Sequence, residues 1–244
     1  LFAKFTLNQR NKAYTNTLAN IKMEFWNENK IEEFRIEDSE IYNTKILSPD
    51  YLQEKDLSYS NLKKLRKEWI KVLPKLEKLE FLYLGHRVNQ EYFEAICQIP
   101  NLKGLWVKIS QIKEFSHISN LKKLEQLNFG GSLSITNLNG IQELKKLKYC
   151  VLDNFFGIEN LKELESLKSI EKLNLLAGFD SKTLNLKSLE SLAELSNLKE
   201  LVLDIKKNLD VKPLLKLEKL NKLVIPNSYH SKVENELPKR TKLK

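Results

Sequence analysis

The sequence predicts an α/β solenoid: a right-handed coil with a parallel inner sheet and an outer face of 3₁₀ turns and short helices. Three observations favour this fold. One apolar pattern recurs seven times, its period is nearly constant, and no run approaches the 18 or so apolar residues of a membrane-spanning helix. A fixed period between about 20 and 50 residues is the signature of a repeat architecture.

Each copy places an apolar residue first, fourth and sixth. Successive copies begin 23, 22, 23, 23, 28 and 22 residues apart. One coil cannot bury these side chains alone, so stacked coils are needed to form a continuous apolar column. The copies are Leu79/Leu82/Leu84, Leu102/Leu105/Val107, Leu124/Leu127/Phe129, Leu147/Cys150/Leu152, Ile170/Leu173/Leu175, Leu198/Leu201/Leu203 and Leu220/Leu223/Ile225.

This L-x-x-L-x-L pattern resembles that of leucine-rich repeat proteins, from about Leu73 to Ser228. The period and lead-ins such as NLKKLEQL are similar to the short-repeat, bacterial, internalin-like members. The resemblance implies a horseshoe fold and, generically, a non-catalytic protein-binding module. The position that usually carries Asn or Cys after the strand differs here, so those turns must satisfy their backbone groups otherwise. It holds Arg87, Ser110, Ser132, Phe155, Gly178, Lys206 and Ser228.

We expect a single domain over residues 1–244. Residues 1–55 form an N-terminal cap with irregular repeats, 56–228 the regular coils, and 229–244 a C-terminal cap and basic tail. Apolar residues every third position from Ile158 to Leu173 favour 3₁₀ turns over a long α-helix.

Less regular segments flank the repeats. Ile31/Phe34/Ile36 predicts a further copy, with one degenerate coil before Leu79. The apolar spacing of Asn61–Val72 predicts a helix. Ser231–Leu237 predicts a short closing helix, and we expect Lys239–Lys244 to fray.

The 28-residue coil contains an insertion near Ala177–Thr183. Insertions in repeat proteins fall in loops, often on the binding side. A longer surface loop also costs little free energy, so a tolerated insertion accounts equally well for the extra residues.

The net charge of +9 raises the possibility of a nucleic-acid or anionic-membrane surface. The strand residues expected to face outward from the core contain four basic and five acidic side chains, a sum of −1. The excess lysine lies in lead-ins such as Lys122/Lys123 and in the tail. A nucleic-acid binder needs a contiguous basic groove, so we expect none on the inner face.

No motif predicts catalysis, a cofactor or a metal site. Metalloprotease, phosphate-loop and nucleophile-elbow patterns are absent, and the three histidines fall on different coils. Cys150 takes a core strand position and Cys97 lies two coils earlier in Gln90–Gln98, too far for a disulfide. We therefore expect no enzyme, no cofactor and two reduced, structural cysteines.

The inner sheet face predicts the candidate site. Phe81 and Tyr83 share one strand, Trp106 lies on the next, and Tyr149 follows two strands later. Exposed aromatic side chains dominate interface hot spots. Lys108 and Asp153 are expected at the polar rim. Two alternatives stay open for these rings: the N-terminal cap folds over them, or they only stabilise the sheet.

The sequence therefore predicts a non-catalytic module that binds a protein on its concave face. One alternative is adhesion to nucleic acid or an anionic membrane through the basic rim. Another is the recognition part of a larger effector or ligase. We expect a monomer in the cytoplasm, although a chain that begins at Leu1 leaves a processed, secreted form open.

Overall fold

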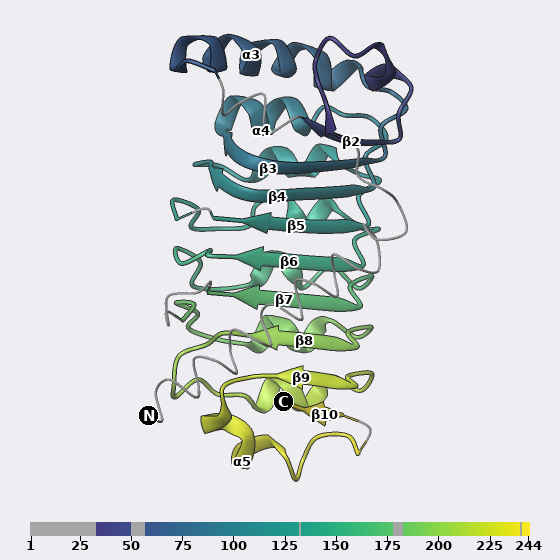
Figure 1. Ribbon diagram of the computed structural model, residues 1–244. Coiled ribbons are helices and arrows are strands. Elements are labelled where there is room, and N and C mark those ends of the chain that lie inside the picture. Colours follow the sequence, from purple (N-terminus) through teal and green to yellow (C-terminus); the bar gives the residue numbers. More distant parts are fainter. Residues whose placement is uncertain (1–32, 50–56, 132, 178–182, 240) are drawn as a thin grey trace.

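The computed structural model describes residues 33–49, 57–131, 133–177, 183–239 and 241–244. Within them, ten strands form one sheet in chain order, and every neighbouring pair is parallel (Figure 1). The strands are β1 (Glu33–Phe34), β2 (Ile46–Pro49), β3 (Phe81–Asn89), β4 (Gly104–Gln111), β5 (Gln126–Gly130), β6 (Tyr149–Asp153), β7 (Lys172–Leu176), β8 (Glu200–Leu203), β9 (Lys222–Val224) and β10 (Lys242–Leu243).

Short helices connect the strands on the other side of the coil, as the period-three spacing predicts. Most are single 3₁₀ turns, including η5 within the predicted stretch. The helical segments are η1 (Ser39–Tyr42), α3 (Tyr59–Val72), η2 (Leu73–Lys75), α4 (Gln90–Ile96), η3 (Ser116–Asn120), η4 (Ile141–Glu143), η5 (Lys162–Leu164), η6 (Glu190–Glu194), η7 (Lys212–Lys216), η8 (Asn227–Tyr229) and α5 (His230–Val233).

Helix α3 confirms the helix predicted over Asn61–Val72 and begins two residues earlier. The hydroxyl of Ser58 accepts a hydrogen bond from the Asn61 amide and so caps the first turn. Leu65 and Trp69, four residues apart, bury one face of the helix. The α-helix gives way to the 3₁₀ turn η2 at Leu73, because Pro74 has no backbone N–H with which to continue the α-helical hydrogen bonds.

The core is one continuous apolar column, because the register stacks each repeat on the next. Leu82, Leu105 and Leu127 are cross-strand partners, and Cys150 follows them in the same row. Four phenylalanines form a second stack beside the leucines. The ring of Phe129 lies 5.4 Å from that of Phe93 and 5.4 Å from that of Phe115. Phe155 extends the stack at 6.3 Å from Phe129.

Backbone hydrogen bonds between coils replace the missing asparagine ladder. The amide of Gly131 donates to the carbonyl of Asp153, and the amide of Asn154 donates to that of Leu176. Asn154 has a φ of 60°, a left-handed conformation that asparagine tolerates. The neighbouring coil therefore supplies hydrogen-bond partners for backbone groups in the turns after the strands, which have no asparagine ladder.

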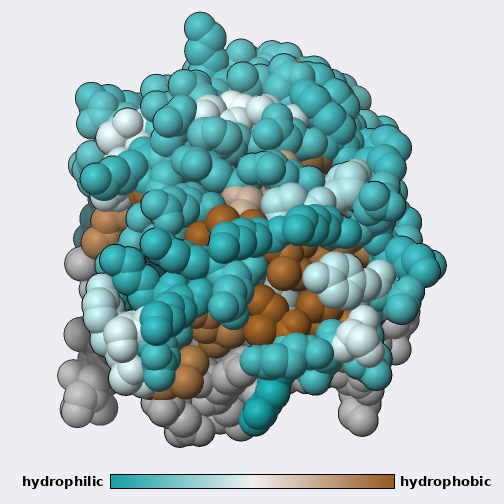
Figure 2. Space-filling view, turned by 90° about the horizontal axis from the view of Figure 1, so that it is seen from above, coloured by the Kyte–Doolittle hydropathy of each residue, from teal (hydrophilic) through white to brown (hydrophobic). Residues whose placement is uncertain are grey.

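The two ends differ from the regular coils. Strand β2 is the degenerate coil predicted before Leu79, whereas much of the predicted cap lies outside the described residues. Viewed from this end, hydrophobic residues lie at the centre among hydrophilic ones (Figure 2). The partly buried hydrophobic residues of this coil are Phe34, Ile36, Leu57, Ile70 and Val72.

The prediction of a frayed C-terminal tail is wrong. Lys242 and Leu243 form β10, whose partners on β9 are Lys222 and Leu223. The open edge of β9 offers unpaired backbone groups, and the tail satisfies them. The closing helix α5 is shorter than predicted and ends at Val233.

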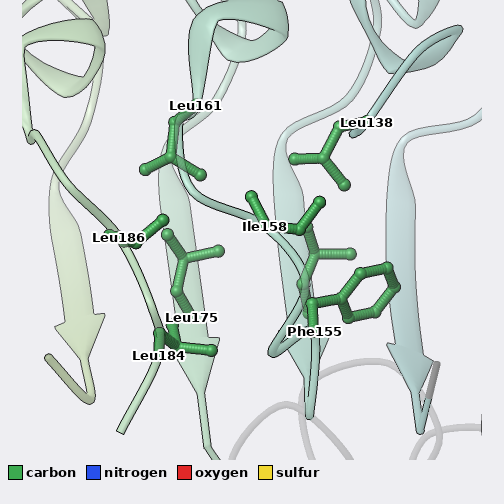
Figure 3. A pocket seen from close by; sticks show the side chains of 8 residues that line it. Leu138, Phe155, Ile158, Leu161, Leu175, Leu184 and Leu186 are labelled. Atoms are coloured by element: carbon green, nitrogen blue, oxygen red, sulfur yellow. The ribbon is translucent and has the colours of Figure 1, made fainter. Parts of the chain in front are cut away.

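A small apolar pocket of about 10 Å³, close to the minimum for one water molecule, lies between the 28-residue coil and the coils before it (Figure 3). After the insertion, Leu184 forms an isolated parallel bridge with Ile205 and rejoins the stack. Residues 178–182 lie outside the described part of the chain. The cavity is lined by Leu138, Leu152, Phe155, Ile158, Leu161, Leu175, Leu184 and Leu186.

Candidate interaction surface

The concave face is the side of the sheet that does not pack on the leucine column. Alternate strand residues point to it, because side chains along a strand alternate between the two faces. Cross-strand pairing aligns one such residue from each of seven strands into a row, which we name the central row. It consists of Tyr83, Trp106, Asn128, Val151, Asn174, Val202 and Val224.

Two of the predicted aromatic anchors meet in this row. The rings of Tyr83 and Trp106 are 5.0 Å apart and nearly perpendicular, the favoured edge-to-face arrangement. Phe81 lies two residues before Tyr83 on β3 and is partly buried. Tyr149 lies two strands from Trp106, and the Lys172 ammonium sits 5.4 Å from its ring centre. The structure thus brings Tyr83 and Trp106 into contact and places Tyr149 in a separate cation–π pair.

The predicted polar rim residues lie beyond the central row, at the carboxyl ends of the strands. Lys108 on β4 is exposed, and Asp153 on β6 is partly buried. Gly130 separates them on β5, in register with Asp153. A Cβ atom at Gly130 would come within 2.5 Å of the Lys108 carbonyl oxygen, so this rim is closely packed.

An apolar stripe extends the concave face toward the C-terminus, and sequence analysis missed it. Val151, Leu176 and Val202 form a buried cluster separate from the leucine column, with Val224 packed against it. The signal was present in the sequence, because all four residues occupy strand positions expected to face outward from the core. Val151, Leu176 and Val202 are 1%, 2% and 6% exposed, so they form a packed apolar cluster rather than an open apolar surface.

A ladder of alternating charge borders the strands at their amino ends, and this feature was also missed. The Lys103 ammonium lies 3.0 Å from a Glu80 carboxylate oxygen, and Lys199 lies 2.7 Å from Glu171. Main-chain amides link successive members, such as Glu125 to the Lys103 carbonyl. The sequence of the ladder is Lys45, Glu80, Lys103, Glu125, Lys148, Glu171 and Lys199. These lysines are paired within the solenoid, so they form no contiguous basic groove.

Glu200 forms a second charge cluster on the concave face. Its carboxylate lies 3.2 Å from the Lys172 ammonium and 2.9 Å from that of Lys222, one from each neighbouring strand. Burial opposes ionisation, but hydrogen bonds and attraction from both lysines outweigh it and lower the pKa of Glu200. The ionised carboxylate therefore holds three adjacent strands together.

Replacing Glu200 with glutamine is expected to lower the free energy of unfolding by about 1 kcal/mol, because two lysines then face each other without a bridging charge. Urea denaturation at neutral pH measures the loss. Glu194→Gln is the matched control, since Glu194 pairs with one lysine at the surface. The control should lose only a few tenths of a kcal/mol. Equal losses in the two variants would show that the second ion pair of Glu200 adds nothing to the free energy of unfolding.

The contribution of Glu200 is expected to depend on pH in a defined direction. A carboxyl whose pKa is lower when folded stabilises the protein above its unfolded pKa, near the ordinary value of 4.5. That stability is lost as the pH falls through the folded pKa. The difference between wild type and Glu200→Gln should therefore be present at pH 7 and shrink below about pH 4.5. A difference that grows on acidification would contradict this assignment.

The described residues contain no group of three or more His, Cys, Asp or Glu side chains placed to hold a metal ion. Cys97 and Cys150 are free and buried, as expected. Burial raises the pKa of both thiols, to about 12 for Cys150. Both thiols are therefore protonated at neutral pH and poorly nucleophilic.

We compared the chain with known protein families, curated proteins and solved structures. No protein-family model and no curated protein matches the chain. Among solved structures, an internalin (InlF) from Listeria monocytogenes superposes with a TM-score of 0.51 and 16% identity over 77% of this chain. Internalin C2 from the same species gives a TM-score of 0.50 and 21% identity over 73% of the chain. The fold is that of a leucine-rich repeat protein.

The leucine-rich repeat horseshoe predicted from the sequence is therefore confirmed, with bacterial proteins as structural neighbours. The match spans 56% of the InlF structure and 76% of the internalin C2 structure. At these identities the likeness concerns the fold alone. Within the described residues, no helix is both long and apolar enough to cross a bilayer.

Proposed function

We propose that this leucine-rich repeat chain is a non-catalytic module that binds a protein partner on its concave face. The observation that supports this proposal is the central row, where aromatic and aliphatic side chains line the sheet face opposite the core. Tyr83 and Trp106 are the proposed anchors, since rigid aromatic side chains bury large area at small entropic cost. Lys108 and Asp153 supply polar contacts at the rim.

Adhesion through basic surface is the weaker alternative. The lysines of the charge ladder alternate with glutamates, and Lys172 and Lys222 bracket Glu200. A phosphate-binding surface needs several unneutralised cations in one groove, and its affinity falls steeply with salt. The assignment to a larger effector stays a prediction that the full reading frame tests. Monomeric state and cytoplasmic localisation also stay predictions.

The decisive test is paired capture from the native source, with the wild type and Tyr83→Ala/Trp106→Ala as baits. The double variant is expected to weaken partner affinity by at least about 100-fold, because each hot-spot truncation typically costs about 2 kcal/mol or more. Mass spectrometry identifies the captured protein, and titration calorimetry measures the affinity. Tyr42→Ala/Tyr59→Ala is the matched control, since it removes two exposed tyrosines elsewhere.

The capture is repeated at low and moderate salt. Unfolding curves first establish that the double variant is folded. If only Tyr83→Ala/Trp106→Ala loses capture of the partner, the result supports binding on the concave face. Capture that survives this variant but disappears with salt would contradict the proposal and favour the basic surface.

A further inference from the structure

Strand β10, next to β9 at the C-terminal end of the sheet (Figure 1), adds lysines to the concave face. Lys242 is in register with Lys222 on β9, which is in register with Glu200 on β8. Lys172 on β7 completes this row. The row lies two positions before the central row, so its side chains share the concave face. Lys244 follows Lys242 by two positions and remains hydrogen-bonded to β9. We name Lys172, Lys222, Lys242 and Lys244 the basic cluster.

The register of β10 places two like charges opposite each other. Lys222 and Lys242 are direct cross-strand partners, an arrangement that destabilises a sheet. On its other side Lys222 is compensated, because the Glu200 carboxylate lies 2.9 Å from its ammonium. Lys242 and Lys244 are exposed, and neither pairs with a carboxylate of the described residues. The ammonium groups of these two lysines are therefore available to an external anion.

The two ends of the concave face differ in charge. From β3 to β6, the positions that flank the central row carry one cation and one anion, Lys108 and Asp153, whose charges cancel. From β7 to β10, the concave residues include the four lysines of the basic cluster and two acids, Glu200 and Asp204, a net charge of +2. The Asp204 carboxylate already accepts a hydrogen bond from the Ala177 amide. Aromatic anchors thus lie at one end of the face and cations at the other.

The extent of the basic cluster decides which class of anion it fits. The cluster spans three strand spacings, about 14 Å, and no further. A nucleic-acid backbone binds cations that continue along a groove. Val224, two positions after Lys222 on β9, is partly exposed and places an apolar contact among the lysines. Carboxylates interspersed with apolar side chains match this surface, and that pattern is typical of an acidic segment of a protein.

We propose that the basic cluster binds an acidic segment of the protein partner. This inference rests on the proposed function and gives the partner a chemistry: carboxylates at the C-terminal end of the concave face and apolar side chains against the aromatic anchors. A partner carboxylate between Lys222 and Lys242 removes their repulsion, as Glu200 does between Lys172 and Lys222. The charges then alternate without interruption from β7 to β10.

An NMR titration of the ¹⁵N-labelled full chain with hexaglutamate tests the basic cluster without the partner. Binding is expected to shift the backbone amide signals of Lys222 and Lys242. Lys242→Gln/Lys244→Gln should weaken hexaglutamate binding at least about tenfold, because two charge-assisted contacts are lost. Lys145→Gln/Lys146→Gln is the matched control, since it removes two exposed lysines from a lead-in. The control should change the affinity less than about twofold. Equal weakening by both variants would overturn the proposal.

Glu200→Gln separates binding by charge from a structural role. The substitution raises the net charge of this end from +2 to +3 and is expected to tighten hexaglutamate binding about threefold at low salt. Damage to the sheet would act in the opposite direction and weaken binding. Unfolding curves and circular dichroism establish that every variant is folded. Weaker binding by folded Glu200→Gln would contradict a site that acts through charge.

Two further probes test the other classes of anion. Hexathymidylate is a single-stranded nucleic acid of similar charge, and phosphatidylserine vesicles present an anionic membrane. Hexaglutamate is expected to bind more tightly than hexathymidylate at equal salt, and the vesicles are expected not to sediment the chain. Tighter binding of hexathymidylate would overturn the assignment to a protein segment. Sedimentation with vesicles that is lost in Lys242→Gln/Lys244→Gln would overturn it as well.

The acidic segment and the proposed function fail separately. Once the partner is identified, Lys242→Gln/Lys244→Gln should weaken its affinity about tenfold. Suppose that capture depends on Tyr83 and Trp106 while hexaglutamate does not bind. The protein-binding function would then stand, and only the acidic segment would be overturned.

Discussion

Replacing Phe129 with alanine is expected to lower the free energy of unfolding by about 3–5 kcal/mol, the usual cost of truncating a buried aromatic side chain. Phe129 is fully buried. Its ring contacts Phe93 and Phe115 edge-on, each at 5.4 Å between centroids. Phe115 also lies 5.9 Å from Phe155, so the four rings form one network across successive coils. Removing the central ring leaves the other three around a cavity.

Chemical denaturation followed by circular dichroism measures the loss. Phe156→Ala is the matched control, because Phe156 follows Phe155 directly yet is only partly buried. We expect the control to cost about 1 kcal/mol. If both variants lost the same stability, the phenylalanine stack would contribute no more than an ordinary surface contact. A reduced denaturant slope in Phe129→Ala would show that the coils no longer unfold together.

The fold was predictable because each coil encodes it locally. The L-x-x-L-x-L spacing determines which side chains face the core, and the register of Leu82, Leu105 and Leu127 confirms it. The ends were less predictable, since their structure depends on a neighbour rather than on a local pattern. Lys242 and Leu243 form a strand because β9 presents an open edge, which no feature of a lysine-rich tail encodes.

The candidate site was predictable only in part. Alternation within each strand places Tyr83 and Trp106 on the concave face, and their contact follows from the register. The charge ladder could not be read from one coil, because Glu80 and Lys103 are 23 residues apart and become neighbours only when coils stack. The residues of the apolar stripe could be read from the sequence as outward strand positions, but their packing into one cluster depends on the stacking of coils. Whether these residues bind a partner stays a proposal.

Replacing Gly140 with alanine is expected to destabilise the protein by about 3 kcal/mol or more, from two causes that act together. Gly140 has a φ of 95°, which non-glycine residues rarely adopt. A Cβ atom there would also overlap the Ser116 carbonyl oxygen and lie 2.9 Å from the carbonyl carbon. Ser116 belongs to the preceding coil, so the added methyl group would push two coils apart.

Two further glycine variants separate these causes in denaturation curves. Gly157→Ala would overlap the Ile135 carbonyl oxygen of the preceding coil, but Gly157 lacks the left-handed φ. Gly85→Ala meets only the Tyr83 ring at 3.4 Å and should cost less than about 1 kcal/mol. If close stacking of coils dominates, Gly157→Ala will lose nearly as much as Gly140→Ala. If backbone conformation dominates, the stability loss of Gly157→Ala will be as small as that of Gly85→Ala. Neighbouring coils must then move apart to admit a methyl group more easily than the close contact with Ile135 indicates.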